Sequence, residues 1–299
     1  MTVTFSDRIK RVAKIYKAIP TLLTLGNILC GFTAILNMLF IYKIPANQLA
    51  SEVPRIACLS AWLIAGAMLF DMLDGWTARQ FNATSDTGLQ MDSLADMVTF
   101  GVAPAIMVAV LAHALADKYL FGSFKWVWLM CCIYVACVAL RLALYNVIAI
   151  SGKSGKVFRG LPSPGGAAAV ASLIFVYRFC AEGGSLKGIL ATICQHPLYD
   201  TYISSGKVGQ YILFVLPIYA GFLGLLMISP IPYIHFGKWL AGPKHHRWKM
   251  AVLILYGVLF AFHPLITAFL SISVYVFFPP VRYLFTSLSP SHKAAQVET

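Results

Sequence analysis

The sequence predicts an all-α fold: a polytopic transmembrane helical bundle with a six-helix core and about two further C-terminal helices. Two observations predict this class. Of the 299 residues, 59% are hydrophobic and only 11% are charged, and apolar runs of about the length that crosses a bilayer recur along the chain. The length alone would suggest one or two soluble domains, but the recurrent apolar runs override that expectation.

The core spans follow one another with loops between them. We expect helices to cross the membrane at residues 20–42, 56–74, 97–116, 126–149, 166–180 and 209–229. Most of these runs come close to the roughly 20 residues that a bilayer requires. The run at 166–180 is short and needs neighbouring residues to complete its crossing.

A further apolar segment, residues 250–281, is too long for one ordinary span. His263 and Pro264 lie in its middle, and proline interrupts a helix, so we expect two short helices there. The chain therefore divides into a basic amphipathic N-terminal segment, a transmembrane core, and C-terminal membrane helices with a tail, at residues 1–17, 18–229 and 230–299.

Basic residues are distributed unevenly between the two sides of this predicted bundle. Lys and Arg are concentrated in the N-terminal segment and in the loops after the second, fourth and sixth spans. Because cytoplasmic loops are enriched in Lys and Arg, we expect the protein to lie in the cell membrane with both termini facing the cytoplasm. The net charge is +12, and the basic residues that produce it are concentrated next to the spans, where anionic lipid headgroups attract them. No nucleic-acid-binding module is visible in the sequence. Lipid, not nucleic acid, is the expected partner.

Four aspartates stand out because ionisable groups between apolar runs are costly and usually functional. Asp71 and Asp74 are spaced i, i+3, and Asp92 and Asp96 are spaced i, i+4, so each pair shares one face of a helix. Four carboxylates brought close together would repel one another without cations between them. The pattern therefore predicts a hard-oxygen site for Mg²⁺, Mn²⁺ or Ca²⁺.

The spacing around these aspartates, D-x2-D-G-x2-A-R-x8-G-x3-D-x3-D, resembles the signature of the CDP-alcohol phosphatidyltransferases. Its positions are filled by Asp71, Asp74, Gly75, Ala78, Arg79, Gly88, Asp92 and Asp96. In that family a CDP-linked donor gives its phosphoryl group to a hydroxyl acceptor, and CMP leaves. A diphosphate donor needs metal ions that neutralise its negative charge, and a cluster of aspartates is suited to bind such ions.

The resemblance implies separate roles for the aspartates. Asp71, Asp74 and Asp92 should hold one divalent cation, and Asp71, Asp92 and Asp96 a second. The two ions are expected to be Mg²⁺ or Mn²⁺, with Ca²⁺ as an alternative. Asp96 should also be the catalytic general base.

The segment 75–91 is expected to form the turn between the second and third spans and to bind CDP-diacylglycerol. A glycine allows close approach of a ligand, and an arginine offers a planar cation to phosphate or to the cytosine edge. The donor-binding residues implied by the resemblance are Gly75, Ala78, Arg79, Ser85 and Gly88.

A second polar group lies at the end of the fourth span. Arg141 sits within an apolar helix, which is costly unless the guanidinium is paired or solvated, and Tyr145 and Asn146 follow on the cytoplasmic side. Pro162 and Pro164 then break the chain around Ser163, and broken backbone at membrane depth usually lines a cavity. A cytoplasmic turn with a snorkelling arginine is the simpler interpretation of the same residues.

This second group resembles the R-L-A-x-[FY]-N-V and F-x-G-L-P-S-P patterns of the integral-membrane phosphatidylserine synthases of bacteria and archaea. The first span also opens like theirs, with Pro20, Thr24, Asn27 and Gly31 in place and Thr21 where Asn is usual. The resemblance implies L-serine as acceptor and a homodimer. The expected serine pocket consists of Asn27, Thr24, Arg141, Asn146 and Ser163.

Other acceptors and one other class of protein fit part of the pattern. Glycerol 3-phosphate, inositol or choline could replace serine, although choline would call for an aromatic cage. An ion-coupled transporter could also use buried carboxylates, but transporters place charges near the midplane and often contain repeated halves. This sequence has one carboxylate cluster near the expected cytoplasmic boundary and no repeated half.

Overall fold

A computed structural model describes the chain over residues 5–80, 86–115, 125–150, 160–181, 207–233, 246–262 and 264–288. These residues are almost entirely helical and include no strand. Among them, seven helices are long and apolar enough to cross a membrane. The chain is therefore a multi-pass membrane protein, and the predicted fold class is confirmed.

The helices have the following bounds, with two short 3₁₀ turns, Ile41–Lys43 and Ala46–Gln48, between the first two. They are α1 (Phe5–Phe40), α2 (Leu49–Gln80), α3 (Asp86–Asp96), η3 (Met97–Val102), α4 (Ala103–Leu115), α5 (Lys125–Ile150), α6 (Ser163–Ala181), α8 (Lys207–Ile228), α10 (His246–Phe262) and α11 (Pro264–Leu288).

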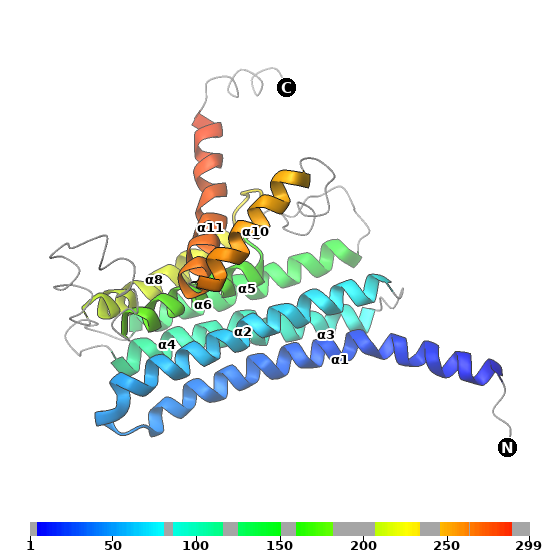
Figure 1. The fold of residues 1–299 in the computed structure, drawn as a ribbon, viewed down its shortest axis with the longest axis horizontal. Helices are drawn as coiled ribbons and strands as arrows, with labels where there is room; N and C mark the ends of the chain where they lie inside the picture. The colour runs from blue at the N-terminus through cyan, green and yellow to red at the C-terminus, as the bar shows by residue number, and fades with distance from the viewer. Residues whose placement is uncertain are drawn as a thin grey trace.

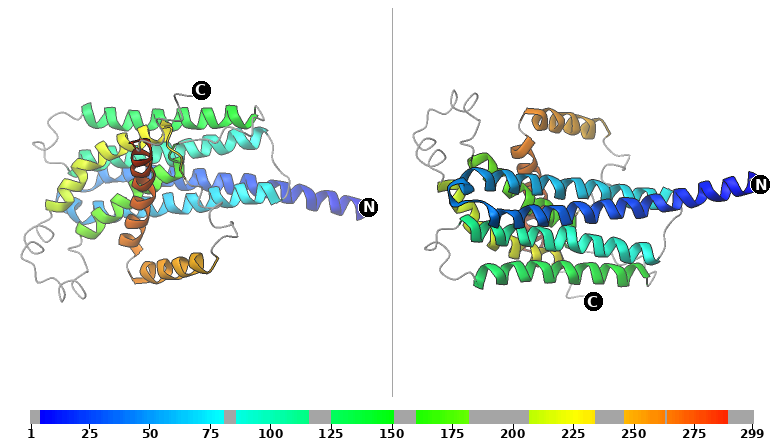
Figure 2. Two further views of the ribbon diagram at one scale, coloured as in Figure 1. Left: turned by 90° about the horizontal axis from the view of Figure 1, so that it is seen from above. Right: turned by 90° about the horizontal axis from the view of Figure 1, so that it is seen from below.

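The continuous helix formed by α3, η3 and α4 is the central element of the bundle. Of its membrane-length window, 67% is buried, against 28% for each of α1, α2 and α5. The helices α1 and α2 lie side by side along it, and α5 packs beside α8 (Figure 1). The shorter helices α6 and α8 cover only the half of the bundle away from the N-terminus (Figures 1 and 2).

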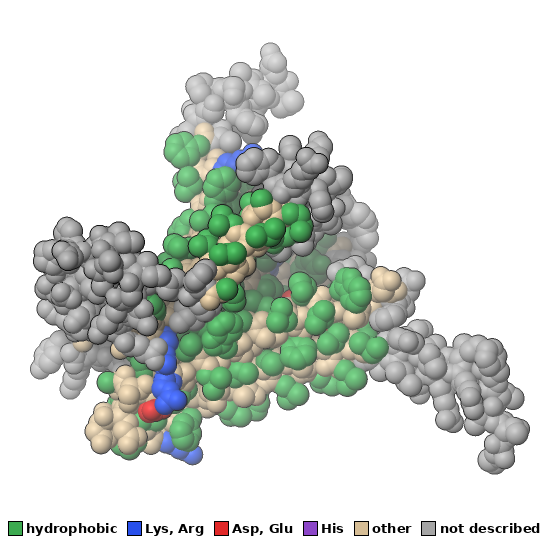
Figure 3. All heavy atoms as spheres, viewed as in Figure 1, with side chains coloured by type: hydrophobic (Ala, Val, Ile, Leu, Met, Phe, Trp, Pro, Cys, Tyr) green, Lys and Arg blue, Asp and Glu red, His purple; other side chains and the backbone are tan. Residues whose placement is uncertain are grey.

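Small side chains let the first two helices approach closely. Ala34 of α1 is fully buried, as are Ala57 and Ala61 of α2, and the Ser60 hydroxyl donates a hydrogen bond to the Ala34 carbonyl at 3.3 Å. Such packing is typical of membrane helices, because lipid gives no hydrophobic drive for their association. Large apolar side chains instead cover the outer surface, as Figure 3 shows.

The second and third spans differ from their predicted boundaries. The helix α2 continues to Gln80 and α3 begins at Asp86, so most of the segment 75–91, expected as a turn, is helical. The third span was accordingly predicted to begin about ten residues too late. Polar residues suggested a loop there, but Gln80, Thr87 and Gln90 are exposed on helices, and a helix accommodates exposed polar side chains as readily as a loop does.

The C-terminal helices confirm the predicted break but not the predicted lengths. The helix α10 ends at Phe262, and Pro264 is the first residue of α11, where its missing amide costs no hydrogen bond. With 25 residues, α11 is not short, whereas α10 is too short to be counted among the seven candidate spans. Figures 1 and 2 show α11 running crosswise to the long axis of the core helices.

Candidate active site

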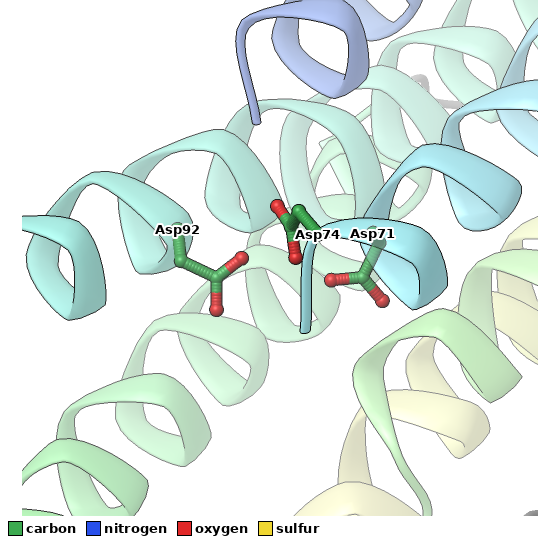
Figure 4. Close-up of side chains that lie close together, drawn as sticks. All are labelled: Asp71, Asp74 and Asp92. Carbon is green, nitrogen blue, oxygen red and sulfur yellow. The ribbon is translucent and has the colours of Figure 1, made fainter. Parts of the chain in front are cut away.

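Three of the four aspartates form a carboxylate cluster between α2 and α3. Asp71 and Asp74 come from α2 and Asp92 from α3, and one ligand oxygen of each lies within 4.8 Å of the others (Figure 4). Asp74 is buried, and the Asp92 Oδ1 atom is buried without a hydrogen-bond partner among the described residues. An orphaned carboxylate oxygen beside two further carboxylates fits a hard divalent cation, because such ions prefer oxygen ligands.

Asp96 lies one turn beyond Asp92 and is held by α1. Its side chain is buried, and its Oδ1 atom accepts a hydrogen bond from the Asn27 Nδ2 atom at 3.2 Å. It is not part of the three-carboxylate cluster, but it is close enough to Asp71 and Asp92 to interact with them electrostatically. Asp96 therefore stands beside the cluster, with its orientation set by an amide from another helix.

The first helix supplies a second support to the carboxylates. The Thr24 hydroxyl lies 2.9 Å from the Asp74 Oδ2 atom and 3.0 Å from the Pro20 carbonyl, so it can donate to either oxygen. Thr24 and Asn27 are spaced i, i+3 and both are buried, which places them on one face of α1 toward the aspartates. Outer groups of this kind orient metal ligands.

Sequence reasoning missed Thr99. Its hydroxyl donates to the Asn27 carbonyl at 3.1 Å, and it lies in η3, a π-helical segment that begins directly after Asp96. A Cβ atom added to Gly31 would lie 2.7 Å from the Thr99 Cα atom, so α1 and η3 can approach this closely only at a glycine. π-Turns inside α-helices are frequent at functional sites, but the sequence carries no simple signal for one.

The predicted donor-binding residues lie along α2 and α3. Gly75 and Ala78 are half-buried on α2, in the turn after Asp71 and Asp74, and Arg79 belongs to the same helix. Gly88 is exposed and lies within the first turn of α3, not in a loop before it. Ser85 lies outside the described residues. Their role in donor binding stays a prediction.

The polar residues of α5 reach the carboxylates from the other side. Arg141 is buried and interacts electrostatically with Asp96, and its Nη1 atom donates to the Met227 carbonyl of α8 at 3.5 Å. Asn146 exchanges hydrogen bonds with Ser93 of α3 at 2.9 and 3.0 Å, directly beside Asp92. Arg141 is therefore a buried residue of the bundle and not a snorkelling surface arginine.

Ser163 is buried at the first position of α6, after a tightly held turn. Gly160 has a φ of 99°, a conformation that favours glycine, and its amide donates to the Ile231 carbonyl at 2.7 Å. The Leu161 amide donates to the Leu226 carbonyl at 3.1 Å. The start of α6 is thus fastened to the end of α8, beside the carbonyl that Arg141 contacts.

The surface in Figure 3 is hollowed between the core helices and the α10–α11 arm, and acidic atoms are visible at the depth of this hollow. The other described acidic side chain, Glu52, is exposed and lies 3.3 Å from Arg55 on the same helix. Within the carboxylate cluster, Asp74 is buried but Asp71 and Asp92 are partly exposed, so the cluster is accessible from outside.

A helical membrane bundle with a recessed carboxylate cluster defines a membrane-embedded protein equipped to bind a divalent cation. The family is more specific than this. The CDP-alcohol phosphatidyltransferase family model matches residues 17–196, and the chain belongs to that family.

Similar proteins are named CDP-diacylglycerol–serine O-phosphatidyltransferase. The protein of Bacillus subtilis (strain 168) is 33% identical over 160 residues, 53% of this chain and 76% of its own length. That of Mycobacterium tuberculosis (strain ATCC 25618 / H37Rv) is 34% identical over 169 residues, 55% of this chain and 51% of its own. That of Helicobacter pylori (strain ATCC 700392 / 26695) is 28% identical over 233 residues, 76% of this chain and 80% of its own. The chain thus spans about half the length of the mycobacterial relatives.

Proposed function

We propose that the protein transfers the phosphatidyl group of CDP-diacylglycerol to L-serine, giving phosphatidylserine and CMP. The observation that carries this proposal is the cluster of Asp71, Asp74 and Asp92, with an orphaned oxygen on Asp92, in a chain of this family. The names of the similar proteins support serine as the acceptor.

Asp71, Asp74 and Asp92 would hold one divalent cation, and Asp71, Asp92 and Asp96 a second, with Mg²⁺ or Mn²⁺ preferred and Ca²⁺ as an alternative. Bound there, the ions would neutralise the charge of the diphosphate and of the departing CMP. Hydrogen bonds from Thr24 to Asp74 and from Asn27 to Asp96 support this proposal, because they orient two of the four carboxylates.

The donor would be bound along α2 and the start of α3. Gly75, Ala78 and Gly88 would let the cytidine and phosphates approach the helices, while Arg79 and Ser85 would donate to them. The acyl chains would stay in lipid, beside the apolar outer surface. The headgroup would enter the hollow in which the acidic atoms lie (Figure 3).

Asp96 would act as the general base. As the serine hydroxyl oxygen bonds to the phosphorus of the phosphatidyl group, the bond from that phosphorus to CMP breaks, and the hydroxyl proton passes to an Asp96 oxygen. The amide of Asn27 holds one Asp96 oxygen at 3.2 Å, which orients the carboxylate.

Serine would lie between α1, α5 and α6. The buried guanidinium of Arg141 would receive its carboxylate, and Asn146 and Ser163 would complete the pocket. The Asn27 Oδ1 atom is buried and has no hydrogen-bond partner among the described residues, so it is available to the serine ammonium. Thr24 would support this side of the pocket through Asp74.

We place the protein in the cytoplasmic membrane, with the active site and both termini toward the cytoplasm, from the distribution of Lys and Arg in the sequence. From the resemblance to the phosphatidylserine synthases, we also propose that the protein forms a homodimer.

The test is an acceptor panel. Purified protein in detergent is given CDP-diacylglycerol, a divalent cation and, in turn, serine, glycerol 3-phosphate, inositol or choline, and the lipid product is identified by mass spectrometry. The proposal expects phosphatidylserine and a matching amount of CMP with serine only. Another lipid product would keep the chemistry and change the acceptor, whereas no CMP release with any acceptor would favour an ion-coupled transporter.

A further inference from the structure

The π-turn η3, which begins directly after Asp96, is followed by a proline in the same continuous helix. In an α-helix the Phe100 carbonyl would accept a hydrogen bond from the amide four residues later, but that residue is Pro104, which has no amide. The helix instead forms π-type hydrogen bonds, and the Ala103 amide donates to the Val98 carbonyl, five residues back. Membrane helices tolerate proline where such an adjustment and a neighbouring helix satisfy the freed backbone groups.

The neighbouring helix here is α5, and the group that it supplies is the Tyr134 hydroxyl. This hydroxyl donates to the Phe100 carbonyl at 2.8 Å, and the Tyr134 side chain is fully buried. A Cβ atom added to Gly224 of α8 would lie 2.9 Å from the Tyr134 Cα atom, so α8 packs closely on the backbone of α5 at this residue. A Cβ atom added to Gly166 of α6 would lie 3.6 Å from the Tyr134 hydroxyl oxygen. Tyr134 is therefore enclosed by η3, α6 and α8.

The π-turn is thus held to the bundle on two sides. On the side of α1, the Thr99 hydroxyl donates to the Asn27 carbonyl at 3.1 Å, and the Asn27 side-chain amide donates to Asp96 at 3.2 Å. On the side of α5, Tyr134 holds Phe100, the residue after Thr99 and the fourth after Asp96. The position of Asp96 therefore depends on a turn with one anchor on each side.

We propose that Tyr134 is a positioning residue for Asp96. Its hydroxyl takes the place of the amide that Pro104 lacks, and together the two residues fix the π-turn that sets Asp96 beside Asn27. This inference rests on the proposed function, because it assumes that Asp96 takes the proton of the acceptor hydroxyl. It holds for any acceptor that reacts through a hydroxyl group.

The first experiment removes only the Tyr134 hydroxyl. In Tyr134→Phe the ring can keep its place between α6 and α8, while the π-turn loses one anchor. We expect kcat for CMP release to fall about ten- to hundredfold, because small displacements of a catalytic group have effects of this size. The KM values for serine and CDP-diacylglycerol should stay within about threefold, since Tyr134 acts through Asp96 and touches neither substrate. The midpoint of thermal unfolding should also fall, because a buried carbonyl loses a donor.

Tyr233→Phe is the matched control for this loss of stability. The Tyr233 hydroxyl donates to the Val276 carbonyl of α11 at 3.0 Å, and its side chain is also buried, so the variant loses the same kind of hydrogen bond. The carboxylate cluster comes from α2 and α3 and not from α11. Tyr233→Phe should therefore lower the midpoint of unfolding by a similar amount and leave kcat within about twofold of the wild type.

Pro104→Ala separates the geometry of the π-turn from stability. It returns an amide to position 104, which can donate to the Phe100 carbonyl as in an α-helix and compete with Tyr134. Alanine also favours a helix more than proline does, so the midpoint of unfolding should not fall. We expect kcat to fall at least about fivefold, since the turn that places Asp96 is altered. A loss of stability cannot produce this combination.

The outcomes separate this inference from the proposed function. If the wild type releases CMP and Tyr134→Phe lowers kcat no more than Tyr233→Phe does, Tyr134 does not position Asp96 and the function stands. A wild-type kcat in Pro104→Ala would overturn the inference as well, and this variant decides the question if Tyr134→Phe does not fold. If another alcohol proves to be the acceptor, kcat is compared with that acceptor. If the wild type releases no CMP with any acceptor, both proposals fail together.

Discussion

Among the clustered aspartates, Asp92 has a buried oxygen, Oδ1, that has no hydrogen-bond partner in the described part of the chain. Asp74 and Asp96 each accept a hydrogen bond from α1, through Thr24 and Asn27. An unpaired buried carboxylate oxygen is costly unless a ligand takes it up. The unpaired oxygen of Asp92 is therefore suited to bind a ligand.

Replacing the shared aspartates tests the proposed pair of ions. Asp71→Asn, Asp92→Asn and Asp96→Asn should each lower CMP release by at least about a thousandfold, because each removes a charged ligand from a site proposed to be shared by two ions or to contain the base. Asp74→Asn should be severe but partly restored by raised metal concentration, since only one ion is expected at Asp74. Metal titrations of CMP release measure both effects. Near-normal turnover of Asp92→Asn would contradict the two-ion site.

Replacing Arg141 tests the proposed acceptor pocket. Arg141→Lys replaces a bidentate fork by a point charge, so the KM for serine should rise about tenfold or more, which corresponds to about 1.4 kcal/mol. The KM for CDP-diacylglycerol should change far less. Ser163→Ala and Asn146→Ala are companion variants with neutral side chains, and we expect a smaller rise in the same constant. Equal losses for both substrates would instead mark Arg141 as a structural residue that fastens α5 to α8.

At the scale of elements, the contact between α1 and η3 connects packing with the proposed chemistry. Thr99 lies three residues after Asp96, and its hydroxyl bonds to the carbonyl of Asn27, whose amide holds Asp96. Gly31 lies four residues after Asn27, one helical turn along α1, and packs directly on Thr99. The spacing of these two helices therefore sets the position of Asn27 relative to Asp96.

Gly31→Ala should separate α1 from η3, because the added methyl group would meet the Thr99 backbone at 2.7 Å. Overpacking of this kind costs about 1–3 kcal/mol, so we expect a lower midpoint of thermal unfolding together with a lower kcat. Gly66→Ala on α2 is the matched control, because a Cβ atom there meets nothing within 4 Å. Wild-type stability and kcat in Gly31→Ala would show that this contact does not position Asp96.

At the scale of the whole molecule, the course of α11 bears on topology. The helix is long and apolar enough to span a membrane, but it runs crosswise to the core helices (Figures 1 and 2). If the core helices cross the bilayer, α11 in this position does not cross beside them. Six of the seven candidate spans among the described residues then remain, an even number, which agrees with the proposal that both termini face the same side.

Single cysteines in a cysteine-free background test this topology with a membrane-impermeant thiol reagent. Cysteines at Thr84 and Ser291 should react only from the cytoplasmic side. A cysteine at Asn47, in the short turn between α1 and α2, should react only from the outside and serves as the control. External labelling at position 291 with internal labelling at 84 would show that α11 crosses as a seventh span.

The sequence by itself determined the helical membrane class, the paired aspartates and the break at Pro264, because each depends on the spacing of residues within one segment. It misjudged the segment 75–91, where polar residues suggested a turn although the helices continue. Local polarity cannot distinguish a loop from a helix that exposes its polar side chains, as Gln80, Thr87 and Gln90 are exposed here.

Only the tertiary structure decided which side chains meet across the bundle. Thr24 and Asp74 are 50 residues apart in sequence, and Asn27 and Asp96 are 69 apart, yet each pair is hydrogen-bonded. The π-turn after Asp96 and the arrival of Tyr275 beside Gly165 also depend on how helices pack. The physical reason is that periodicity assigns a residue to a face of its own helix, whereas its neighbour on the next helix is chosen by close packing of the whole bundle.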